Sequence, residues 1–555
     1  MNLSKYVAEY LYQSGVRSVF MLSGTGSIHL DDAFAFHKGL RYVCARHEAA
    51  AMDMAVGYAK LTGGLGVVIA TTGPGGTNAV GGLVEAWVDS VPIVVISGQV
   101  PKQVMSETAR SFGVQGFRIV DVVKPMTKYA ALVTDPQKIR IHLEEACYKA
   151  REGRQGPVWL DIPWDVQSAD IDIEGLIGFH PAESKEQNAL EFANMDSLLD
   201  ALREAKRPVL LAGQGIRTGG AQNEFIKFIN RLQIPVLFAR MGLDVMPYSH
   251  PLNFGLAGMR GRRFCANILD QADLVIGLAT SMSYPCVGDA YIKFQSDTKF
   301  ALVNIDKMAF TESSTPVHFP VCAHIKDFLV EMNRRLCDTP VEVPADWLNT
   351  CTNLKTSFPT VLPNYAQTPI NSYYFIQILE AQSTRDAVFV SDAGSAYYIC
   401  GQGLAFEGER REVSSGAFAS MGVAIPLGIG CSCAFPERQI LVVTGDGSIE
   451  LNIQELRTIS QNQLNIKVFV INNGGYASIR ASQDVIMGGR YTDDQSILNF
   501  AKVATAFDLP FYLLESHTTL APDISKILKT SGPALIEVVC DRNQAIIAVG
   551  SPQTH

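Results

Sequence analysis

Short runs of β-branched and apolar residues alternate with helical patterns along most of this 555-residue chain. This alternation is typical of parallel sheets covered by helices on both faces, because their strands are buried on both sides. It predicts an α/β fold built from doubly wound parallel sheets. In the first part of the chain, the predicted strands are Ser18–Leu22, Tyr42–Cys44, Gly66–Ala70 and Ile93–Ser97, and the predicted helices are Asn2–Ser14, Ile28–His37, His47–Leu61 and Gly76–Val88.

The length of the chain and two polar segments suggest three domains. At roughly 150 residues per domain, the chain has room for three or four. The polar segment Pro181–Asn194 and the acidic, Pro-containing segment Pro340–Pro344 are typical of linkers. In the later parts, the predicted strands are Pro208–Ala212, Asp273–Gly277, Phe300–Ile305, Ala387–Ser391, Gln439–Thr444, Ile466–Ile471 and Ala534–Val538, and helices are predicted at Leu451–Gln461 and, rich in glycine, after Gly416.

The composition argues against two classes of partner. A net charge of −9, with no basic run, makes a nucleic-acid partner unexpected. The longest apolar stretch, Ala417–Phe435, is interrupted by polar residues and proline, so we expect a buried helix and no membrane span. The N-terminus shows no signal-peptide pattern, and the 11 cysteines are scattered. We therefore expect a cytoplasmic protein with reduced thiols.

Two turns in the last third of the chain carry the most specific chemistry. Gly445-Asp446-Gly447-Ser448 follows a predicted strand, and Asn472-Asn473-Gly474-Gly475-Tyr476 follows the next one. Both turns should lie at the carboxyl edge of one sheet, where open α/β folds bind ligands. The glycines allow close approach of a phosphate group, while the Asp446 carboxylate and the Asn473 amide oxygen suit Mg²⁺. The alternative is two turns without a ligand.

The spacing of these turns resembles the fingerprint of enzymes that depend on thiamine diphosphate (ThDP), and the residues after Ser448 resemble the acetolactate synthase-like members of that family. The resemblance covers essentially the whole chain and is weakest in the middle part. The resemblance implies a pyrimidine-binding domain at 1–170, a central domain at 190–340 and a diphosphate-binding domain at 360–545. Further matching segments are Arg46-His47-Glu48-Ala49-Ala50-Ala51, Gly57-Tyr58-Ala59, Thr72-Gly73-Pro74-Gly75-Gly76-Thr77-Asn78, Asp89-Ser90-Val91-Pro92-Ile93, Gly156-Pro157-Val158 and Asp161-Ile162-Pro163.

The resemblance implies a carboligase that decarboxylates a 2-oxo acid, most simply pyruvate, and transfers the acyl carbanion to an acceptor carbonyl. In this family a buried carboxyl binds the aminopyrimidine ring of the cofactor and promotes loss of the C2 proton of its thiazolium ring. Glu48 occupies that position. The alternative is that Glu48 is an ordinary acidic residue in the first turn of a helix, favoured there by the helix dipole.

Other site residues are likewise implied by the resemblance. Met421 would support the bent cofactor, or else fill a core. The backbone near Gly26 would face the reactive carbon, Gln115 falls at the family's active-site glutamine, and His29 is either a proton shuttle or a surface residue at a helix start. The implied cofactor-binding residues are Gly73, Asn78, Gly394, Ser395, Met421, Gly445, Gly447, Ser448 and Tyr476, and the implied metal ligands are Asp446, Asn473 and Gly475.

Two positions depart from the acetolactate synthases of branched-chain amino-acid biosynthesis. A tryptophan that shapes their acceptor pocket is replaced by Ser482, and a lysine after the Asp-Ile-Pro segment is replaced by Trp164. Loss of an indole would open the acceptor side by about 200 Å² of surface. An acceptor bulkier or more polar than a simple 2-oxo acid thus becomes a candidate. The run Asn473-Gly474-Gly475-Tyr476-Ala477-Ser478-Ile479-Arg480 also resembles carboligases that acylate ketones or nucleotide-linked keto-sugars.

Three questions stay open. The first is whether FAD binds. Some relatives bind FAD in the central domain through a charged run, and this chain has the uncharged run Ala279-Thr280-Ser281-Met282-Ser283-Tyr284 at that place. Two other segments could face a nucleotide or be simple turns: Gly213-Gln214-Gly215 and Gly258-Met259-Arg260-Gly261. The family arrangement implies a homodimer or a dimer of dimers, with the active site at the subunit interface. The alternatives to ligation are a ThDP-dependent decarboxylase or C–C lyase and an inactive binding relative.

Overall fold

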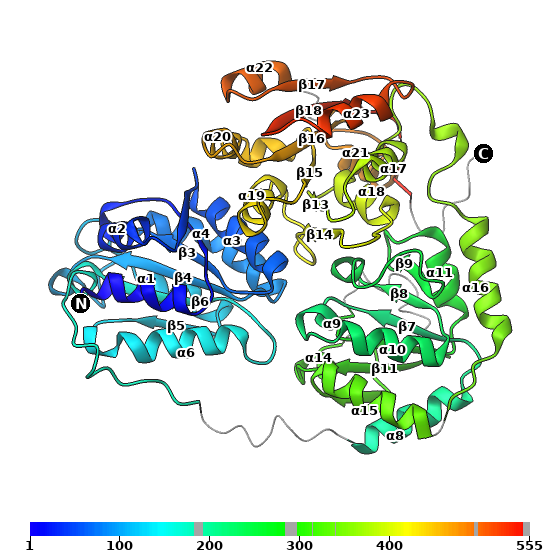
Figure 1. Cartoon of the computed structure of the whole chain (residues 1–555), viewed down its shortest axis with the longest axis horizontal. Coiled ribbons are helices and arrows are strands. Elements are labelled where there is room, and N and C mark those ends of the chain that lie inside the picture. Colours follow the sequence, from blue (N-terminus) through cyan, green and yellow to red (C-terminus); the bar gives the residue numbers. More distant parts are fainter. Residues whose placement is uncertain are drawn as a thin grey trace.

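The computed structural model of the protein describes residues 1–181, 192–282, 297–313, 315–338, 340–492, 498–544 and 546–547. It contains three parallel sheets of six strands each, with helices on both faces (Figure 1), which confirms the predicted α/β class. The sheet order is β2-β1-β3-β4-β6-β5 in the first unit and β14-β13-β15-β16-β18-β17 in the third, so these two share one topology. The second sheet has the order β12-β11-β10-β7-β8-β9.

The first unit has a buried and mainly apolar centre. Strands β3 and β4 are buried along their whole length, because β-branched residues fill both faces. Its elements are α1 (Leu3–Gln13), β1 (Ser18–Met21), η1 (Thr25–Ser27), α2 (Ile28–Phe36), β2 (Arg41–Cys44), α3 (Glu48–Thr62), β3 (Gly66–Ala70), α4 (Pro74–Val88), β4 (Ile93–Gln99), η2 (Lys102–Val104), α5 (Ile119–Val123), η3 (Lys124–Met126), β5 (Tyr129–Leu132), η4 (Pro136–Lys138), α6 (Ile139–Arg151), β6 (Val158–Pro163) and α7 (Trp164–Gln167).

The second unit follows the predicted linker at Pro181–Asn194, most of which lies outside the described residues. Amphipathic helices such as α10 bury one apolar stripe against its sheet. Its elements are α8 (Phe192–Glu204), β7 (Pro208–Ala212), α9 (Gly215–Thr218), α10 (Gln222–Leu232), β8 (Val236–Phe238), η5 (Arg240–Gly242), β9 (Asn253–Leu256), α11 (Arg263–Gln271), β10 (Leu274–Leu278), β11 (Lys299–Asn304), α14 (Met308–Thr311), β12 (Phe319–Cys322), α15 (Ile325–Asp338) and α16 (Ala345–Ser357).

The third unit repeats the design of the first. Its central strands β15 and β16 are almost entirely buried. Its elements are η6 (Pro363–Tyr365), α17 (Ser372–Gln382), β13 (Val388–Ser391), α18 (Ser395–Gly403), β14 (Arg411–Ser414), α19 (Ala424–Ala434), β15 (Ile440–Gly445), η7 (Ile449–Asn452), α20 (Glu455–Gln461), β16 (Ile466–Asn472), α21 (Ala477–Ile486), α22 (Phe500–Ala506), β17 (Phe511–Leu514), α23 (Leu520–Leu528) and β18 (Ala534–Val539).

Two predicted helices of the third unit differ from the structure. The Gly-rich helix begins only at Ala424, because Gly422 adopts a left-handed φ of 81° and its N–H donates to the Asp392 carboxylate. The helix predicted at Leu451–Gln461 is divided into η7 and α20. Its first turns are tightened by i→i+3 hydrogen bonds, such as that from the Leu456 N–H to the Ile453 carbonyl, as is common near helix N-termini.

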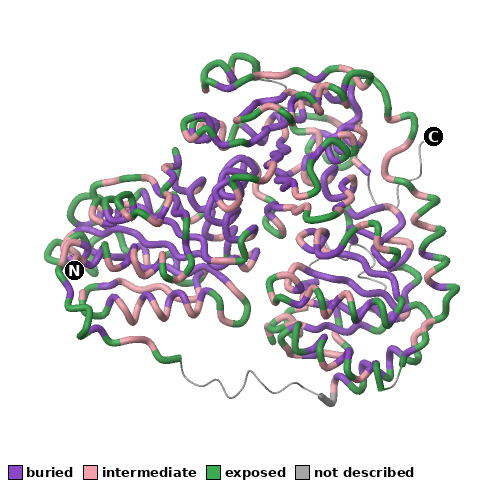
Figure 2. Tube along the Cα trace, in the orientation of Figure 1, coloured by how far each residue is buried: buried purple, intermediate pink, exposed green. Residues whose placement is uncertain are grey.

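Helices α3 and α19 join the first unit to the third (Figure 1). Both are buried along most of their length, and Figure 2 shows this buried path between the two units. Small residues let the two backbones approach closely: a Cβ at Gly57 would overlap the Leu427 carbonyl oxygen, and one at Gly430 would overlap the Met54 carbonyl oxygen. In the described part of the chain, no helix combines the length and the apolar composition that crossing a bilayer requires.

Gly430→Ala should therefore destabilise the α3–α19 contact. Since neither backbone can yield easily, we expect the free energy of unfolding to fall by about 1–3 kcal/mol, the usual result of overpacking. Gly81→Ala is a matched control, because a Cβ at this position in α4 meets no atom within 4 Å, and it should leave stability unchanged or raise it by up to about 1 kcal/mol. Urea unfolding measures both variants, and equal midpoints would contradict the packing argument.

Candidate active site

The turns after β15 and β16 meet at the carboxyl edge of the third sheet. Strand pairing places Gly445 opposite Ile471, so Asp446 and Asn473 continue from neighbouring strands. The Asp446 carboxylate accepts hydrogen bonds from three backbone N–H groups: Gly447 at 2.9 Å, Asn473 at 3.1 Å and Gly475 at 2.9 Å. Burial raises the pKa of Asp446, although these N–H groups act in the opposite direction. A cation beside this carboxylate would stabilise its charged form.

The residues around Asp446 leave space for a bound group. A Cβ at Gly394 or at Gly445 would meet no atom closer than a serine hydroxyl 3.9 Å away. One of these hydroxyls, Ser478 Oγ, is buried and has no hydrogen-bond partner among the described residues. Ser395 begins helix α18 next to Gly394, and the first backbone N–H groups of a helix have no partner within it. These features fit the diphosphate of ThDP.

The metal would depend on amide and carbonyl oxygens together with Asp446. Within the described ranges, no three His, Cys, Asp or Glu side chains gather as a metal site. Asn473 Nδ2 lies 3.5 Å from Ser395 Oγ, which places the predicted amide ligand beside the predicted diphosphate site. One carboxylate plus neutral oxygens and phosphate oxygens is the donor set that Mg²⁺ prefers. The residues present therefore fit Mg²⁺.

The remaining predicted residues of the third unit lie around this edge. The ring of Tyr476 packs directly on Gly447, where a Cβ would lie 3.0 Å from Tyr476 Cδ1. Ser448 is buried and begins the first turn of η7. Met421 precedes Gly422, whose carbonyl accepts a hydrogen bond from Asn452 Nδ2 at 3.0 Å. Met421 is half-buried and thus not a fully buried core residue.

A second cluster lies at the carboxyl edge of the first sheet. Glu48 begins α3 and is 5% exposed, and its Oε2 accepts a hydrogen bond from Asn78 Nδ2 at 3.0 Å. Gly73 begins α4 with a φ of 64°, and Gln115 crosses over it so closely that a Cβ on Gly73 would overlap the Gln115 carbonyl oxygen. Gln115 itself is exposed and has a left-handed φ of 64°. Such strain is stored most often at functional sites.

The turn at Gly26 and the neighbouring His29 complete this edge. The Gly26 N–H donates to Thr71 Oγ1 at 3.2 Å, and its carbonyl accepts from Gln167 Nε2 at 2.8 Å. The ring of His29 lies 4.7 Å from the ring of Trp164, and His29 Nε2 is buried without a partner among the described residues. A buried imidazole nitrogen without a partner is available for a ligand or a proton.

Two supporting residues were missed from the sequence. Arg480 is buried, and its guanidinium donates to the Gly474 carbonyl and, at 2.8 Å, to the Asn473 carbonyl, so it fixes the second turn. The second is Gln167, whose side-chain amide donates to the Gly26 carbonyl and fixes that turn. Arg480 lies in the Gly-Tyr-Ala-Ser-Ile-Arg run that carries part of the resemblance, but only the fold shows that its side chain turns back. Ser482, which replaces the relatives' tryptophan, is exposed, and its hydroxyl donates to the Ser478 carbonyl within α21.

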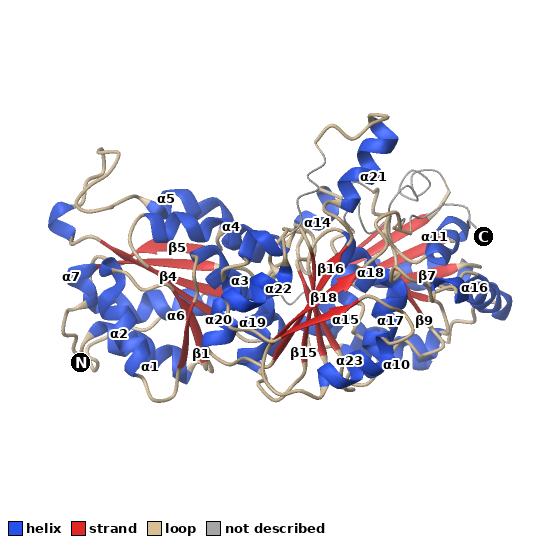
Figure 3. Ribbon diagram, turned by 90° about the horizontal axis from the view of Figure 1, so that it is seen from above, coloured by secondary structure: helices blue, strands red, loops and turns tan. Residues whose placement is uncertain are grey.

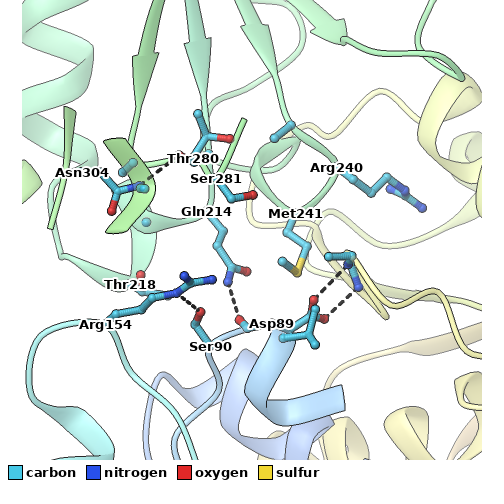
Figure 4. Close-up of a pocket in the computed structure, with 18 of the residues that line it drawn as sticks. Asp89, Ser90, Arg154, Gln214, Thr218, Arg240, Met241, Thr280, Ser281 and Asn304 are labelled. Carbon is cyan, nitrogen blue, oxygen red and sulfur yellow. Dashed lines mark hydrogen bonds between the residues drawn. The ribbon is translucent and has the colours of Figure 1, made fainter. Parts of the chain in front are cut away.

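A cavity of about 690 Å³ lies where the three units meet (Figure 4), and we call it the junction cavity. The loop at Gly213–Gly215 and residues Ala279–Ser281 line it from the second unit, whereas Ser283 and Tyr284 lie outside the described residues. Each unit contributes one non-glycine residue with a left-handed φ to its wall: Ser90, Ala279 and Ala419. The cavity also reaches Gly394. It therefore adjoins the predicted diphosphate site.

Comparisons with known proteins agree with this geometry. Residues 1–128, 195–332 and 392–538 match the N-terminal TPP binding domain, the central domain and the C-terminal TPP binding domain of thiamine pyrophosphate enzymes. The chain is 32% identical over 560 residues to the acetolactate synthase large subunit of Lactococcus lactis, covering 98% of this chain and 93% of that protein. It is 30% identical over 557 residues to the acetolactate synthase isozyme 1 large subunit of Escherichia coli, covering 99% and 96%.

The buried Asp161 gives a prediction about pH. Its carboxylate accepts from Ser97 Oγ at 2.6 Å and from Gln99 Nε2 at 2.9 Å, and Gln99 Nε2 also donates to the Phe117 carbonyl beside the Gln115 loop. Burial raises the pKa of Asp161 from 3.8 to about 7. Folding thus takes up a proton between these values, so the stability contributed by this group falls as pH rises from about 4 to about 7. In Asp161→Asn, the free energy of unfolding should not show this decrease between pH about 4 and about 7. Urea unfolding at several pH values in this range measures it. Parallel pH profiles would contradict the assignment.

Proposed function

The chain belongs to the thiamine pyrophosphate enzymes, as an acetolactate synthase-like member, and on this basis we propose that it is a carboligase. When bound, ThDP would supply the nucleophilic carbon needed to decarboxylate a 2-oxo acid and to transfer its acyl carbanion to an acceptor carbonyl. The donor we propose is pyruvate, and the acceptor is a 2-oxo acid, a ketone or a keto-sugar. One observation carries the proposal: the Asp446 carboxylate is fixed by both turns beside open space at Gly394 and Gly445.

The third unit would hold the diphosphate end. Asp446, Asn473 and the Gly475 carbonyl would bind Mg²⁺, in keeping with their oxygen chemistry. Backbone N–H groups at the start of α18 would donate to phosphate oxygens, because a helix N-terminus stabilises negative charge. The residues that we place along the cofactor are Gly394, Ser395, Met421, Gly445, Gly447, Ser448 and Tyr476.

The first unit would supply the acid–base groups. Asn78 occupies Glu48 Oε2, and Oε1 lies on the side of Gly75, 3.4 Å from where a Cβ would stand there. We assign Glu48 Oε1 to share a proton with the aminopyrimidine ring. Gly73 would lie along the cofactor, and Gly26 and Gln115 would border the substrate. These residues would orient the cofactor and the substrate.

A decarboxylase or C–C lyase is the second candidate. His29 favours it, because an imidazole nitrogen that is buried and unpaired among the described residues could deliver a proton in place of an acceptor carbonyl. Ser482 favours ligation, since a small exposed side chain leaves room for an acceptor.

A product screen separates these functions. The protein is incubated with ThDP, Mg²⁺ and pyruvate, alone and with 2-oxo acids, diketones and keto-sugars. We expect CO₂ release together with acetolactate, acetoin or an acylated acceptor. Acetaldehyde as the main product would favour the decarboxylase, and no CO₂ from any 2-oxo acid, despite bound ThDP, would contradict catalysis.

We propose that a second copy of the chain completes the site. Glu48 and Asp446 belong to different units, and their carboxylates share no hydrogen-bond partner among the described residues. Helix α21 projects from the body of the third unit (Figure 3). Large apolar side chains are exposed on and near this helix, which is typical of an interface. They are Ile479, Val485 and Ile486 on the helix and Met487 at its C-cap.

We also propose that the junction cavity binds FAD. Its volume suits a large ligand, and the Gly213–Gly215 loop and Ala279–Ser281 line it. Arg154 lines the cavity and pairs with Asp306 at 3.1 Å, so a phosphate would compete with that carboxylate for the guanidinium. Flavin fluorescence after heat release from the purified protein, and binding of added FAD, measure this directly.

Glu48→Gln should keep ThDP bound but slow the exchange of its C2 proton for deuterium. The expected reduction is about 10²- to 10⁴-fold, the usual contribution of a positioned acid–base group. NMR of quenched samples gives the exchange rate, and calorimetry gives the ThDP affinity. An unchanged exchange rate with bound cofactor would contradict the role of Glu48.

Mixing two inactive variants tests the shared site. Glu48→Gln and Asp446→Asn chains are dissociated, combined in equal amounts and reassociated. If each site takes Glu48 from one chain and Asp446 from the other, half of the dimers are mixed and each has one intact site, so about a quarter of the wild-type activity should return. Differently tagged chains verify that mixed dimers form. Mixed dimers without activity would place the site within one chain.

A further inference from the structure

Asp89 connects all three units at the wall of the junction cavity (Figure 4). Its carboxylate is buried and accepts hydrogen bonds from the Gly416 N–H at 2.7 Å and the Ala417 N–H at 3.0 Å, both in the third unit. Lys60 Nζ lies 2.6 Å from the same carboxylate. The Asp89 carbonyl accepts from Gln214 Nε2, in the second unit, at 2.9 Å. One residue thus binds groups from three parts of the chain.

The bound segment leads directly to Met421. Gly416 and Ala417 lie just before it, and the next anchor comes from the same helix as Asp89, because Ser420 Oγ donates to Glu85 Oε2 at 2.8 Å. Glu85 and Asp89 are one helical turn apart in α4 and its C-cap, so they present one face to the segment. Ala419 has a left-handed φ of 55°, a conformation that needs support from its surroundings.

The contact between Asp89 and residues 416–417 requires a carboxylate at position 89. Two consecutive N–H groups converge on a charged carboxylate, and such bonds are shorter and stronger than those between neutral groups. Lys60 supplies the compensating charge and also donates to the Ser414 carbonyl at 2.6 Å, so it holds the start of the same segment. An amide at position 89 could accept only one of the two N–H groups and would direct its own NH₂ at the other.

We propose that Asp89 is a positioning residue that fixes residues 415–421 and thereby the side chain of Met421 beneath the cofactor. This inference rests on the proposed ThDP function, and it assigns the placement of Met421 to the first unit of the same chain. The Gln214 bond means that the wall of the junction cavity and the Met421 segment share this anchor.

Asp89→Asn tests the proposal against Asp273→Asn. Asp273 is a matched control, because its carboxylate also accepts from two consecutive N–H groups, those of Lys206 at 2.8 Å and Arg207 at 2.9 Å, beside the amino end of β10 and away from both sites. In Asp89→Asn, we expect amide exchange in a peptide covering 414–423 to accelerate roughly ten- to a hundredfold, since a hydrogen bond to a charged group is lost. The ThDP affinity should fall by a similar factor. Asp273→Asn should change neither.

Amide exchange is measured without cofactor, so it tests Asp89 even if the wild-type protein does not bind ThDP. Failure of the wild-type protein to bind ThDP would contradict the proposed function, but not the role of Asp89 in fixing the segment. Unchanged exchange in Asp89→Asn, or faster exchange in both variants, would overturn the proposal. Faster exchange with unchanged ThDP affinity would also overturn it, because Met421 would then not depend on the segment. If Asp89→Asn does not fold, Ser420→Ala removes the second anchor, and it should accelerate exchange in the same peptide.

Discussion

The register between β15 and β16 is the constraint on which the site depends. Because the strands are parallel and Gly445 pairs with Ile471, the chain leaves both strands at the same edge and the two turns must meet. The Asp446 carboxylate then accepts hydrogen bonds from N–H groups of both turns, and Arg480 donates to two carbonyls of the second turn. A slip of one residue in this register would turn Asp446 to the other face of the sheet.

The first and third sheets position the start of a helix near the site in the same way. Their strand orders coincide, and in each a helix near the site begins at a glycine with a left-handed φ, Gly73 in one and Gly394 in the other. A Cβ would be strained at both positions, so helix N–H groups can approach a ligand closely. The second sheet has another order and faces the junction cavity with its own glycine loop at Gly213–Gly215.

Local patterns predicted the class of fold and the composition of the site, but not its supports. Apolar runs identified most central strands because those strands are buried on both faces, and motif spacing brought Asp446 and Asn473 together on neighbouring strands. Asp89 was part of a matched segment, yet its partners in the other two units are more than 100 residues away in sequence, and no local pattern encodes such contacts. Tertiary contacts likewise decided where the Gly-rich helix begins, through Gly422. The domain boundaries and the roles of the site residues remain predictions.

Paired buried charges hold the second unit against the third beside the junction cavity. Arg240 pairs with Glu412, and Asp244 pairs with both Arg217 and Arg411, so the second unit is tied to the third by buried ions. Burial raises the pKa of Asp244, but Arg411 and Arg217 outweigh that effect and hold it below its ordinary value. Separating such a pair would leave an uncompensated charge, which costs about 3–5 kcal/mol when buried. A rotation of one unit would break several pairs together, so the cavity wall keeps the geometry in which Asp89 holds the Met421 segment.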